Sequence, residues 1–475
     1  MAKLTDKIYP LVPVWFQNIG ISAYGYAWKK RRFGGIFEKE LKKFKERENF
    51  TAQQWRDYQT VELRKLLCHA FKTVPFYNKK YTYHGFNTSS FTKFELEDLP
   101  LLPVLSKQDL RKFGTTTLIS SKKDKKGAFF SSSGSTGTPT KILYSKTMHQ
   151  RWTACFESRV KNWAGVSHHN IRGMIGGRRI VPEGLGKPPF YRWNIFEKQV
   201  YFSAYHIAPA NVENYLEGMK KHGVEYMMGY AMSNFFIAKF LLDSGFEVPR
   251  LKAVVTSSEK LTPEMRQIFE QTYQCRAFDT WSSVEACGQI SECEHGSLHI
   301  SPDIGILEFL NKKNQNAVPG EQAEIVCTGL LNQSQPLIRY RISDIAILSQ
   351  DKCPCGREMP TVKDIGGRIE DIITGKDGRK MVRFHGIFIN IPKIKEAQVI
   401  QHTLQDFEIL IKTDEPLLAS EEAIIQQRME SQLGVINLKI SSVQEIPKGQ
   451  NGKFKAVISH LNWRLSTGHN WLIDS

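Results

Sequence analysis

The sequence predicts an α/β protein with a large N-terminal domain of α/β layers and a small β-rich subdomain, followed by a small α+β C-terminal domain. Three observations predict this fold class. From Trp152 onward, helical segments alternate with short apolar strands, which is typical of a largely parallel sheet covered by helices. After Asp303, short strands follow one another with turns between them. After Gly366-Gly367, the remaining residues, about a hundred, again mix strands and helices and can close as a separate lobe.

The N-terminal segments are rich in aromatic and basic residues. Residues 8–28 combine aromatic side chains with glycine and predict an arm, either packed on the main body or touching a membrane surface: Trp15, Phe16, Tyr24, Tyr26 and Trp28. A basic helix is expected over residues 35–47. The apolar spacing in residues 51–71 predicts an amphipathic helix, which Val74-Pro75 then ends.

The central segments follow the α/β pattern. Buried strands are expected at residues 171–175, 226–228 and 253–255, and helices at residues 210–221, 233–244 and 263–273. In the β-rich part, strands are expected at residues 304–310, 323–327 and 345–348. Apolar runs before and after residues 131–141 predict one strand entering that loop and one leaving it.

Length and composition limit the class of protein. A chain of 475 residues can bury at least one large core, and its apolar and charged fractions are ordinary for a globular protein. No run of about 18 apolar residues occurs, and the N-terminus lacks a secretory cleavage pattern. Eight unevenly spaced cysteines do not form a disulfide framework. We therefore expect a cytoplasmic protein.

The formal net charge of +17 collects in short blocks, at residues 29–32, 42–47 and 122–126. Such blocks can meet an anionic bilayer, a polyanionic carbohydrate or nucleic acid, or they can form solvated surface faces. No helix-turn-helix, RNA-binding or zinc-finger spacing is present, so we expect no specific nucleic acid partner. Peripheral contact with the inner membrane surface or with polysaccharide, through the N-terminal arm, is the expected alternative.

The stretch SSSGSTGTPTKILYS, residues 131–145, predicts a loop that binds phosphate. Gly134 and Gly137 allow backbone conformations in which successive amide groups converge on one anion. Hydroxyl donors surround them at Ser132, Ser133, Ser135, Thr136 and Thr138. The Walker-A pattern is absent, and a flexible Ser/Gly linker is the alternative interpretation.

Four further segments add polar groups in a fixed order: VVTSSE at 254–259, FDTWSSVE at 278–285, RYRISD at 339–344 and PKGQNGK at 447–453. Together with GRIED at 367–371, these motifs resemble the adenylate-forming ligases, in the branch of phenylacetate-CoA ligase and the CapK-type proteins found with capsular polysaccharide genes. The resemblance covers most of the chain. The N-terminal arm is more similar to the CapK-type proteins.

The resemblance implies a division of the chain into three parts. Residues 1–125 would form the N-terminal arm and the helical part of the large domain. Residues 126–367 would form the ATP- and acyl-binding core with the β-rich subdomain, and residues 368–475 a small mobile lobe that carries the catalytic lysine.

The resemblance also implies roles for individual residues. Trp281 would stack on adenine, Asp344 would accept hydrogen bonds from both ribose hydroxyls, and Glu285 would hold Mg²⁺. Lys453 is the predicted catalytic lysine, with Lys455 as its nearest rival. The other predicted nucleotide contacts are Ser258, Glu259, Asp279, Thr280, Ser282 and Arg368. The acyl pocket is expected at Tyr205, His206, Tyr230 and Ala231.

Elementary chemistry explains why such groups are needed. When a carboxylate attacks the α-phosphorus of ATP, two anions come together and charge develops on the phosphate oxygens. Backbone N–H groups, Mg²⁺ and a mobile ammonium group stabilise that charge. Two departures from the family pattern, Ser282 for glycine and Val284 for threonine, remove one hydroxyl contact to the α-phosphate.

The cysteines predict a separate metal site. Cys353-Pro354-Cys355-Gly356 can present two thiolates, and Cys293 with His295 or His299 can supply two more ligands, a set that suits structural Zn²⁺. Similar segments in relatives of this branch imply the set Cys293, His299, Cys353 and Cys355, with Cys287 as an outside candidate. Reduced thiols without a metal are the alternative.

The sequence thus predicts an ATP-dependent acid ligase that forms an acyl-adenylate. The acyl group would then pass to coenzyme A or, in the CapK-like version, to an amine or hydroxyl of a cell-surface polysaccharide or its precursor. A non-catalytic, basic docking protein with a decayed nucleotide cleft is the third hypothesis. The acid itself is not specified by the sequence.

Overall fold

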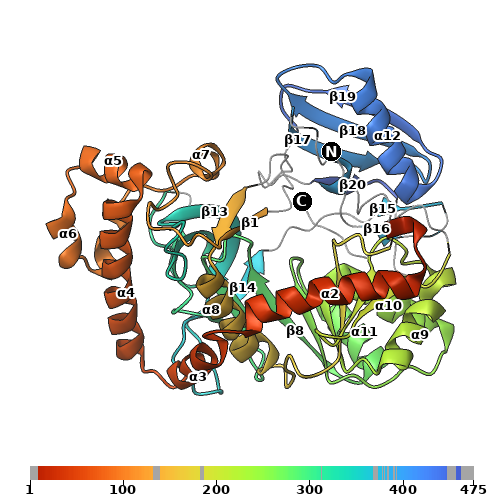
Figure 1. The fold of residues 1–475 in the computed structure, drawn as a ribbon, viewed down its shortest axis with the longest axis horizontal. Coiled ribbons are helices and arrows are strands. Elements are labelled where there is room, and N and C mark those ends of the chain that lie inside the picture. The colour runs from red at the N-terminus through yellow and green to blue at the C-terminus, as the bar shows by residue number, and fades with distance from the viewer. Residues whose placement is uncertain are drawn as a thin grey trace. The chain divides into compact units, whose positions relative to one another are not determined.

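The computed structural model of the chain describes residues 9–131, 140–181, 187–311, 313–366, 373–376, 378, 380–381, 385–388, 391, 393–446 and 456–461. These residues fall into two compact units, with the residues up to 366 in the first and those from 373 in the second. Figure 1 shows the elements of both units.

The first unit is organised around one long sheet. In the described residues it has twelve strands in the order β11-β12-β13-β14-β10-β9-β8-β7-β6-β3-β5-β4. The strands are β3 (Arg172–Gly176), β4 (Tyr191–Asn194), β5 (Gln199–Ser203), β6 (Tyr226–Tyr230), β7 (Ala253–Ser257), β8 (Arg276–Ser282), β9 (Gln289–Glu292), β10 (Leu298–Ile300), β11 (Gly305–Leu310), β12 (Gln322–Gly329), β13 (Tyr340–Leu348) and β14 (Thr361–Gly366).

One half of this sheet is parallel. Strands β5, β3, β6, β7 and β8 run in the same direction, and the antiparallel β4 closes the edge. The strands expected at residues 171–175, 226–228 and 253–255 are confirmed as β3, β6 and β7. They are buried on both faces, which explains their continuous apolar runs.

The other half of the sheet is antiparallel. The predicted β-rich part after Asp303 is present as β11, β12 and β13, but it is continuous with the parallel half through the pairs β8–β9, β9–β10 and β10–β14. The sequence could not show this, because β9 and β10 are only four and three residues long. A two-stranded ribbon lies apart, with β1 (Ala128–Ser131) antiparallel to β2 (Lys141–Tyr144), which confirms the strands expected beside the loop.

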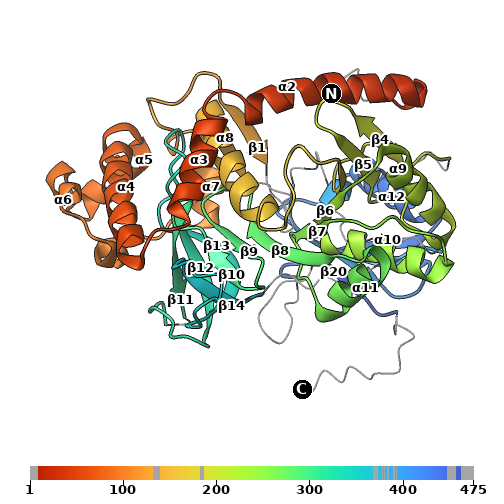
Figure 2. The ribbon, with the colours of Figure 1, turned by 90° about the horizontal axis from the view of Figure 1, so that it is seen from below.

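Helices cover both faces of the parallel strands. On one side lie α9 (Val212–His222), preceded by η4 (Pro209–Asn211), α10 (Ala231–Ser244) and α11 (Pro263–Tyr273); on the other lie α8 (Lys146–Phe156) and the π-helical turn η3 (Glu157–Lys161) (Figure 2). Val160 of η3 and Ala164 after it pack in one apolar cluster with residues of β6, β7 and β8, namely Tyr226, Val255 and Phe278. The helices predicted over residues 210–221, 233–244 and 263–273 are confirmed as α9, α10 and α11.

The N-terminal helices flank the antiparallel half. They are α3 (Phe37–Arg47), α4 (Ala52–Thr73), α5 (Pro75–Tyr83), α6 (Thr88–Thr92), η2 (Leu96–Leu101) and α7 (Lys107–Phe113). Thr51 caps α4 through a hydrogen bond from the backbone N–H of Gln54, and Pro75 begins a new helix, as the break at Val74-Pro75 predicted. A fully buried ion group joins these helices to the sheet: Arg47 and Arg159 both bind the carboxylate of Asp303.

The arm expected over residues 8–28 is helical. After the short turn η1 (Tyr9–Leu11), α2 (Val14–Phe33) runs twenty residues along the outer surface of the first unit, beside β4 and α8 (Figure 2). Ser22 and Gly25 on its inner side and the exposed Gly20 lower helix propensity, and the sequence analysis predicted an arm here without predicting a helix. Among the described helices, none is both long enough and apolar enough to cross a bilayer.

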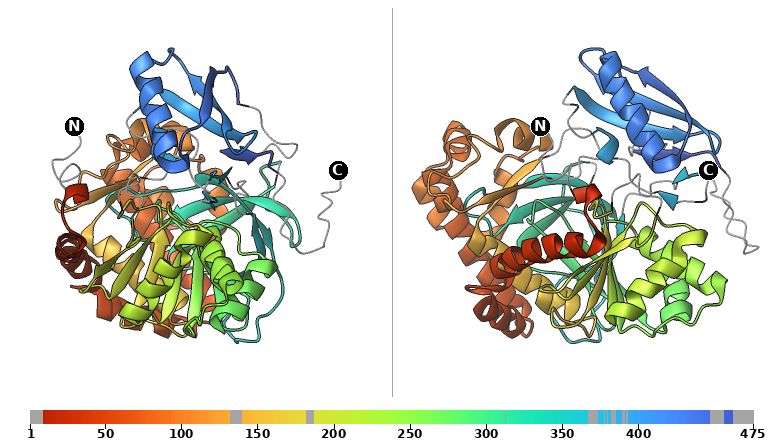
Figure 3. Two further views of the ribbon diagram at one scale, coloured as in Figure 1. Left: turned by 90° about the vertical axis from the view of Figure 1, so that its right-hand side faces the viewer. Right: turned by 45° about the vertical axis from the view of Figure 1, so that its right-hand side comes forward.

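The second unit is a small α+β domain. Its sheet has the order β19-β18-β17-β20, with β17 (Ile394–Gln401), β18 (Asp406–Thr413), β19 (Asn437–Ser442) and β20 (Val457–Ser459). Helix α12 (Ala419–Leu433) connects the parallel strands β18 and β19, and it buries Ile425, Met429 and Leu433 (Figure 3). Three short elements precede β17 in the chain: β15 (Ile373–Thr374), β16 (Lys380–Met381) and η5 (His385–Phe388).

Candidate active site

The predicted site residues of the first unit gather at one edge of the sheet, where the parallel strands end. Tyr205 and His206 follow β5, Tyr230 ends β6, and Ser258 follows β7. The register aligns these ends, because Tyr230 pairs with Ser257 and Ser257 pairs with Thr280 of β8. In open α/β sheets, ligands bind at the carboxyl ends of the strands, because loops and helix N-termini converge there.

The residues predicted for the acyl pocket are held firmly. Tyr205 is nearly buried, and its hydroxyl donates to the carbonyl of Gly177, which follows β3 (3.1 Å). His206 is buried, stacks on Phe190, and has Nδ1 2.7 Å from Oγ of Ser203. The loops after β5 and β3 are thus joined at this edge.

Glu259 links the loop after β7 to the start of α10. Its Oε2 accepts a hydrogen bond from the backbone N–H of Met232 (2.9 Å), in the first turn of that helix, which begins at Ala231. A carboxylate is favourable there because the N-terminal N–H groups of a helix are unpaired and carry partial positive charge. Ser258, with φ of 72°, forms the turn that brings Glu259 to this position.

Trp281 and Asp344 are neighbours, although 63 residues separate them in the chain. The indole Nε1–H of Trp281, on β8, donates to Oδ2 of Asp344, on β13, over 3.0 Å. Both side chains are half-buried. The two residues predicted to hold adenine and ribose therefore lie side by side, where the parallel and antiparallel halves of the sheet face each other.

Glu285 lies in a buried pocket of hydroxyl groups. Its Oε1 accepts hydrogen bonds from the hydroxyls of Thr140 (3.2 Å) and Tyr340 (3.3 Å). Burial, reinforced by the negative charge of Glu285, raises the pKa of Tyr340 and of Tyr144 well above the usual range, so both phenols stay protonated. Tyr144 donates to the carbonyl of Val284 (2.6 Å), which fixes the loop that carries Glu285.

Two predicted residues of β8 are engaged within the sheet. Thr280 is buried and its hydroxyl donates to the carbonyl of Ile290 (3.1 Å), so a nucleotide contact at this position would use the backbone. Asp279 lies 3.4 Å from the hydroxyl of Thr256. Burial and the nearby Glu292 raise the pKa of Asp279 to about 6. Ser282 ends the strand, half-buried and paired with Gln289.

Several predicted residues lie outside the described part of the structure. These are Ser132, Ser133, Gly134, Ser135, Thr136, Gly137, Thr138, Arg368 and Lys453. The described neighbours of the predicted phosphate loop are informative, because Thr140 is fully buried against Glu285. Thr140, the first described residue after the predicted loop, is therefore next to the carboxylate that was predicted to hold Mg²⁺.

The sequence-based prediction missed four residues that lie beside the predicted site residues. Thr140 and Tyr340 contact Glu285, and Arg178 and Arg179 are exposed in the loop after β3, close to the predicted acyl pocket. Arg179 lies over the ring of Tyr205, at 5.8 Å from its centroid. Two adjacent arginines directly after a buried strand could have indicated a site for an anion. In contrast, nothing in the sequence links Tyr340 to Glu285.

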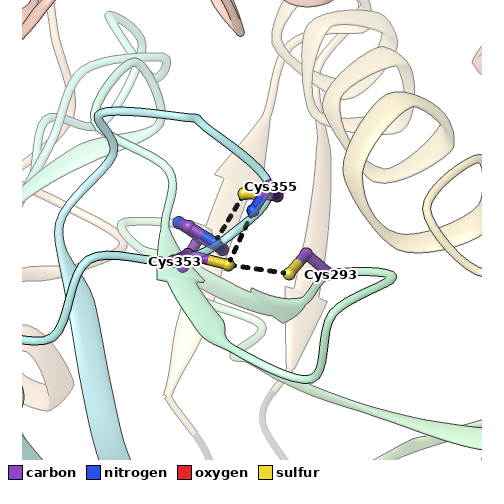
Figure 4. A group of neighbouring side chains, drawn as sticks. Cys293, Cys353 and Cys355 are labelled. Atoms are coloured by element: carbon purple, nitrogen blue, oxygen red, sulfur yellow. Dashed lines mark hydrogen bonds between the residues drawn. The ribbon is translucent and has the colours of Figure 1, made fainter.

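A second constellation lies on the antiparallel half. One potential ligand atom from each of Cys293, His299, Cys353 and Cys355 lies within 4.8 Å of the others. Figure 4 shows that the three cysteines point toward one another. Sγ of Cys293 lies 3.5 Å from Sγ of Cys353, and Sγ of Cys355 lies 3.4 Å from Nε2 of His299. This is the set that the resemblance implied, with His299 rather than His295; the backbone N–H of His295 donates to Sγ of Cys293. Cys287 is buried elsewhere, in the main core.

The surroundings of this cluster suit a metal. His299 is fully buried, and its Nδ1 lies 3.3 Å from the carbonyl of Met359, which leaves Nε2 facing the sulfur atoms. Trp55, Trp163 and Met359 enclose the group. Three thiolates and one imidazole form a closed set of soft ligands, the kind that binds structural zinc.

Comparison with solved structures shows the class of fold. The chain superposes on 2-hydroxyisobutyryl-CoA ligase, in its postadenylation state, with a TM-score of 0.56 and 18% identity, covering 87% of this chain and 91% of that one. A second structure of that ligase, in its thioesterification state, gives the same TM-score. The protein therefore has the fold of the adenylate-forming ligases, with a large N-terminal and a small C-terminal domain, and the predicted fold class is confirmed.

Comparison of sequences shows the relatives. Protein CapK of Staphylococcus aureus is 25% identical over 96% of this chain and its own full length. Phenylacetate-coenzyme A ligase of Thermus thermophilus is 23% identical over 87% of this chain and 98% of its own length. Residues 373–460 match the family model of the CapK C-terminal domain. The chain is homologous to CapK and to the phenylacetate-coenzyme A ligases, as the resemblance of its motifs predicted.

Proposed function

We propose that this protein is an adenylate-forming ligase that activates a carboxylic acid with ATP. The acid would attack the α-phosphorus of ATP, forming the acyl-adenylate and releasing pyrophosphate. The observation that carries the proposal is the contact between Trp281 and Asp344, because it joins the residues predicted for adenine and ribose at the carboxyl edge of the sheet. The homologous ligases and the shared fold support it.

The described residues have defined tasks in this proposal. The two carboxylate oxygens of Asp344 can accept hydrogen bonds from two ribose hydroxyls, and the indole of Trp281 offers a flat apolar surface for adenine. Glu285 would hold Mg²⁺, which neutralises phosphate charge when bound. The carboxylate of Glu285 is a buried, hard oxygen ligand, and the hydroxyls of Thr140 and Tyr340 that contact its Oε1 keep it oriented.

The acid would lie at the ends of β5, β3 and β6. In the proposal this region is lined by Tyr205, His206, Tyr230 and Ala231. The rings of the two tyrosines and the histidine suit an aryl or other apolar acid. Arg178 and Arg179 add two exposed cations at the same edge, which would attract an anionic substrate.

The acyl acceptor has two candidates. The first is the thiol of coenzyme A, as in the phenylacetate-coenzyme A ligases to which the chain is similar. The second is an amine or hydroxyl of a capsular polysaccharide or its precursor. It is favoured by the similarity to CapK along 96% of the chain and by the match of the C-terminal domain. In both versions a nucleophile replaces AMP at the acyl carbon.

We also propose that Cys293, His299, Cys353 and Cys355 hold a structural Zn²⁺ ion. The ion would tie the end of β9 and strand β10 to the loop between β13 and β14, segments about 60 residues apart that also meet through the β10–β14 pairing and the ion pair of Arg357 with Glu294. The site lies in the antiparallel half of the sheet, so its role in this proposal is stability. A cytoplasmic location stays a prediction.

The adenylation proposal is tested by carboxylate-dependent exchange of labelled pyrophosphate into ATP, measured over a broad panel of acids. We expect at least one acid to support exchange. Asp344→Asn should weaken the apparent affinity for ATP about 10- to 100-fold, because hydrogen bonds to a charged group contribute about 1.5–3 kcal/mol. Asp364→Asn is the matched control, since Asp364 lies on the neighbouring β14 and pairs with Lys260.

A second experiment separates the acceptors. The enzyme is supplied with the active acid, ATP and either coenzyme A or an amino sugar nucleotide, and products are identified by mass. A thioester supports the first acceptor, and an amide or ester supports the second. If no acid gives exchange and Asp344→Asn leaves ATP binding unchanged, the protein is instead the non-catalytic docking protein of the third hypothesis.

A further inference from the structure

Helix α2 differs from most surface helices, because it buries small and polar residues and exposes apolar ones. Its inner face is small and polar, with Gln17, Ser22 and Gly25 buried. Asn18 accepts a hydrogen bond from the backbone N–H of Trp193 (3.0 Å), and the hydroxyl of Ser22 contacts the carbonyl of Trp193. Trp193 belongs to β4, the edge strand of the sheet. The polar face of α2 therefore covers the unpaired backbone groups of a sheet edge.

The outer face of α2 is apolar and exposed. The side chains of Trp15, Phe16, Ile19 and Tyr26 are exposed to 64%, 49%, 56% and 53%. At a spacing of 100° per residue these four positions fall within about 100° of one another, and the buried Gln17 and Gly25 lie outside that span. Burial of apolar surface is favourable by about 25 cal/mol per Å². Contact of these side chains with an apolar partner would therefore be favourable.

The apolar surface extends beyond the helix. The ring of Tyr26 contacts the ring of Phe196 (5.1 Å between centroids), and Phe196 and Ile195 are themselves exposed to 44% and 58%. Leu11, before the helix, is also exposed. Contiguous exposed apolar surface of this kind marks a contact surface for a partner or a membrane.

Positive charge borders this surface at one end of the helix. Lys29 and Lys30 are exposed in the last turns of α2, and no acidic residue occurs from Lys7 to Phe37. Arg31 donates to the carbonyl of Lys126, which places the exposed basic turn at residues 122–126 beside the same helix end. Aromatic side chains flanked by lysines are typical of helices that lie at a membrane interface.

We propose that α2 docks flat on an anionic lipid bilayer. Trp15, Phe16, Ile19 and Tyr26 would enter the boundary between headgroups and acyl chains, and Lys29 and Lys30 would contact anionic headgroups. The charge favours this occupant over a second copy of the chain, because two such helix ends would repel each other. The hydrogen bonds of the inner face hold α2 on β4, so docking needs no rearrangement of the helix. The inference does not depend on the proposed catalytic function.

The test is flotation of the full chain with phosphatidylcholine vesicles, with and without phosphatidylglycerol. We expect binding to the anionic vesicles that falls as salt is added, because each lysine near the surface is worth about fivefold in affinity. Trp15→Ser/Phe16→Ser/Ile19→Ser should weaken binding at least tenfold, and Lys29→Glu/Lys30→Glu about tenfold or more. Tyr83→Ser is the matched control, since Tyr83 is an exposed aromatic residue at the end of α5.

Other outcomes would overturn the proposal. Equal binding to neutral and anionic vesicles would contradict docking on anionic lipid through the lysines, and binding to neither would remove the lipid contact. If sedimentation shows a dimer that the triple serine variant dissociates, the apolar surface is an interface between copies of the chain. The lysine variant leaves the apolar side chains in place, so it decides the matter even if the triple variant folds poorly. Pyrophosphate exchange should be unchanged in the lysine variant.

Discussion

At the scale of single residues, the chemistry around Glu285 depends on which neighbours carry charge. Thr140 and Tyr340 contact its Oε1 as neutral donors, and the raised pKa of Tyr340 keeps that phenol protonated at physiological pH. A neutral donor orients the carboxylate without cancelling its charge. Neither of these two hydroxyl partners carries a positive charge that would compete with a cation bound by Glu285.

Asp279 predicts a specific dependence of stability on pH. Burial and the nearby Glu292 raise its pKa from the ordinary 3.8 to about 6, so the folded protein holds this proton more tightly than the unfolded chain does. The stabilisation is fully present below pH 3.8 and is lost as the pH rises through about 6. Asp279→Asn should therefore gain stability relative to the parent protein, by on the order of 2 kcal/mol, between about pH 4 and pH 7.

Urea unfolding of both proteins at a series of pH values measures this difference. The quantity of interest is the difference in unfolding free energy, because other groups titrate equally in the two proteins. A difference that stays constant over this range would contradict the raised pKa of Asp279.

At the scale of elements, helix α2 and strand β4 approach each other closely at one glycine. A Cβ atom on Gly25 would lie 2.1 Å from Nδ2 of Asn194, a buried side chain whose amide also donates to Glu197 (2.9 Å). Gly20, on the same helix, has no atom within 4 Å of its Cβ position. A side chain at Gly25 would thus clash with Asn194, whereas a side chain at Gly20 would meet no neighbouring atom.

Gly25→Ala and Gly20→Ala should therefore change stability in opposite directions. Gly25→Ala should lower the free energy of unfolding by about 1–3 kcal/mol, the usual cost of overpacking. Gly20→Ala should raise it by about 0.5–1 kcal/mol, because alanine favours a helix over glycine. Denaturant unfolding at constant pH measures both, and a gain in both variants would mean that α2 does not rest on Asn194.

The cysteine cluster predicts a metal-dependent stability. The purified protein should contain one zinc ion per chain, and a chelator or Cys353→Ser should remove the ion and lower the melting temperature, because a ligand that binds only the folded state stabilises it. Cys68→Ser is the control, since Cys68 lies outside the cluster. Substoichiometric zinc in protein prepared without chelator would refute the assignment.

At the scale of the whole molecule, the two units divide the proposed chemistry. The described residues of the candidate site belong to the first unit, whereas Lys453 belongs to the sequence of the second and lies outside the described residues. Family resemblance predicts that the small lobe turns between two half-reactions, so that one cleft serves both.

This division predicts unequal effects on the two half-reactions. Lys453→Ala should slow adenylation, measured by pyrophosphate exchange, on the order of 10²-fold or more, because the ammonium group stabilises charge only in that step. Transfer from a supplied acyl-adenylate to the acceptor should be nearly unchanged. Lys455→Ala is the matched control, two residues away. If Lys455→Ala slows exchange and Lys453→Ala does not, the catalytic role moves to Lys455.

Much of the fold could be predicted from sequence because local patterns determine it. The helix at α11 and the strands β3, β6 and β7 follow from apolar periods and turn residues that act over a few neighbours. Helix α2 was missed as a helix, because its glycines weaken the local signal and the contacts that hold it come from β4, about 170 residues later. The short β9 and β10 carried too little pattern to reveal one continuous sheet.

The sequence by itself determined the class of fold, the order of the motifs, and the three cysteines of the proposed metal site with two histidines as alternatives, since all of these reside in residue type and spacing. Tertiary structure alone decided which residues meet: Trp281 with Asp344, Tyr340 with Glu285, and His299 rather than His295 with the cysteines. It also decided that the polar side of α2 faces inward. The physical reason is that pairing of distant strands selects these contacts, and no local property of the chain encodes that pairing.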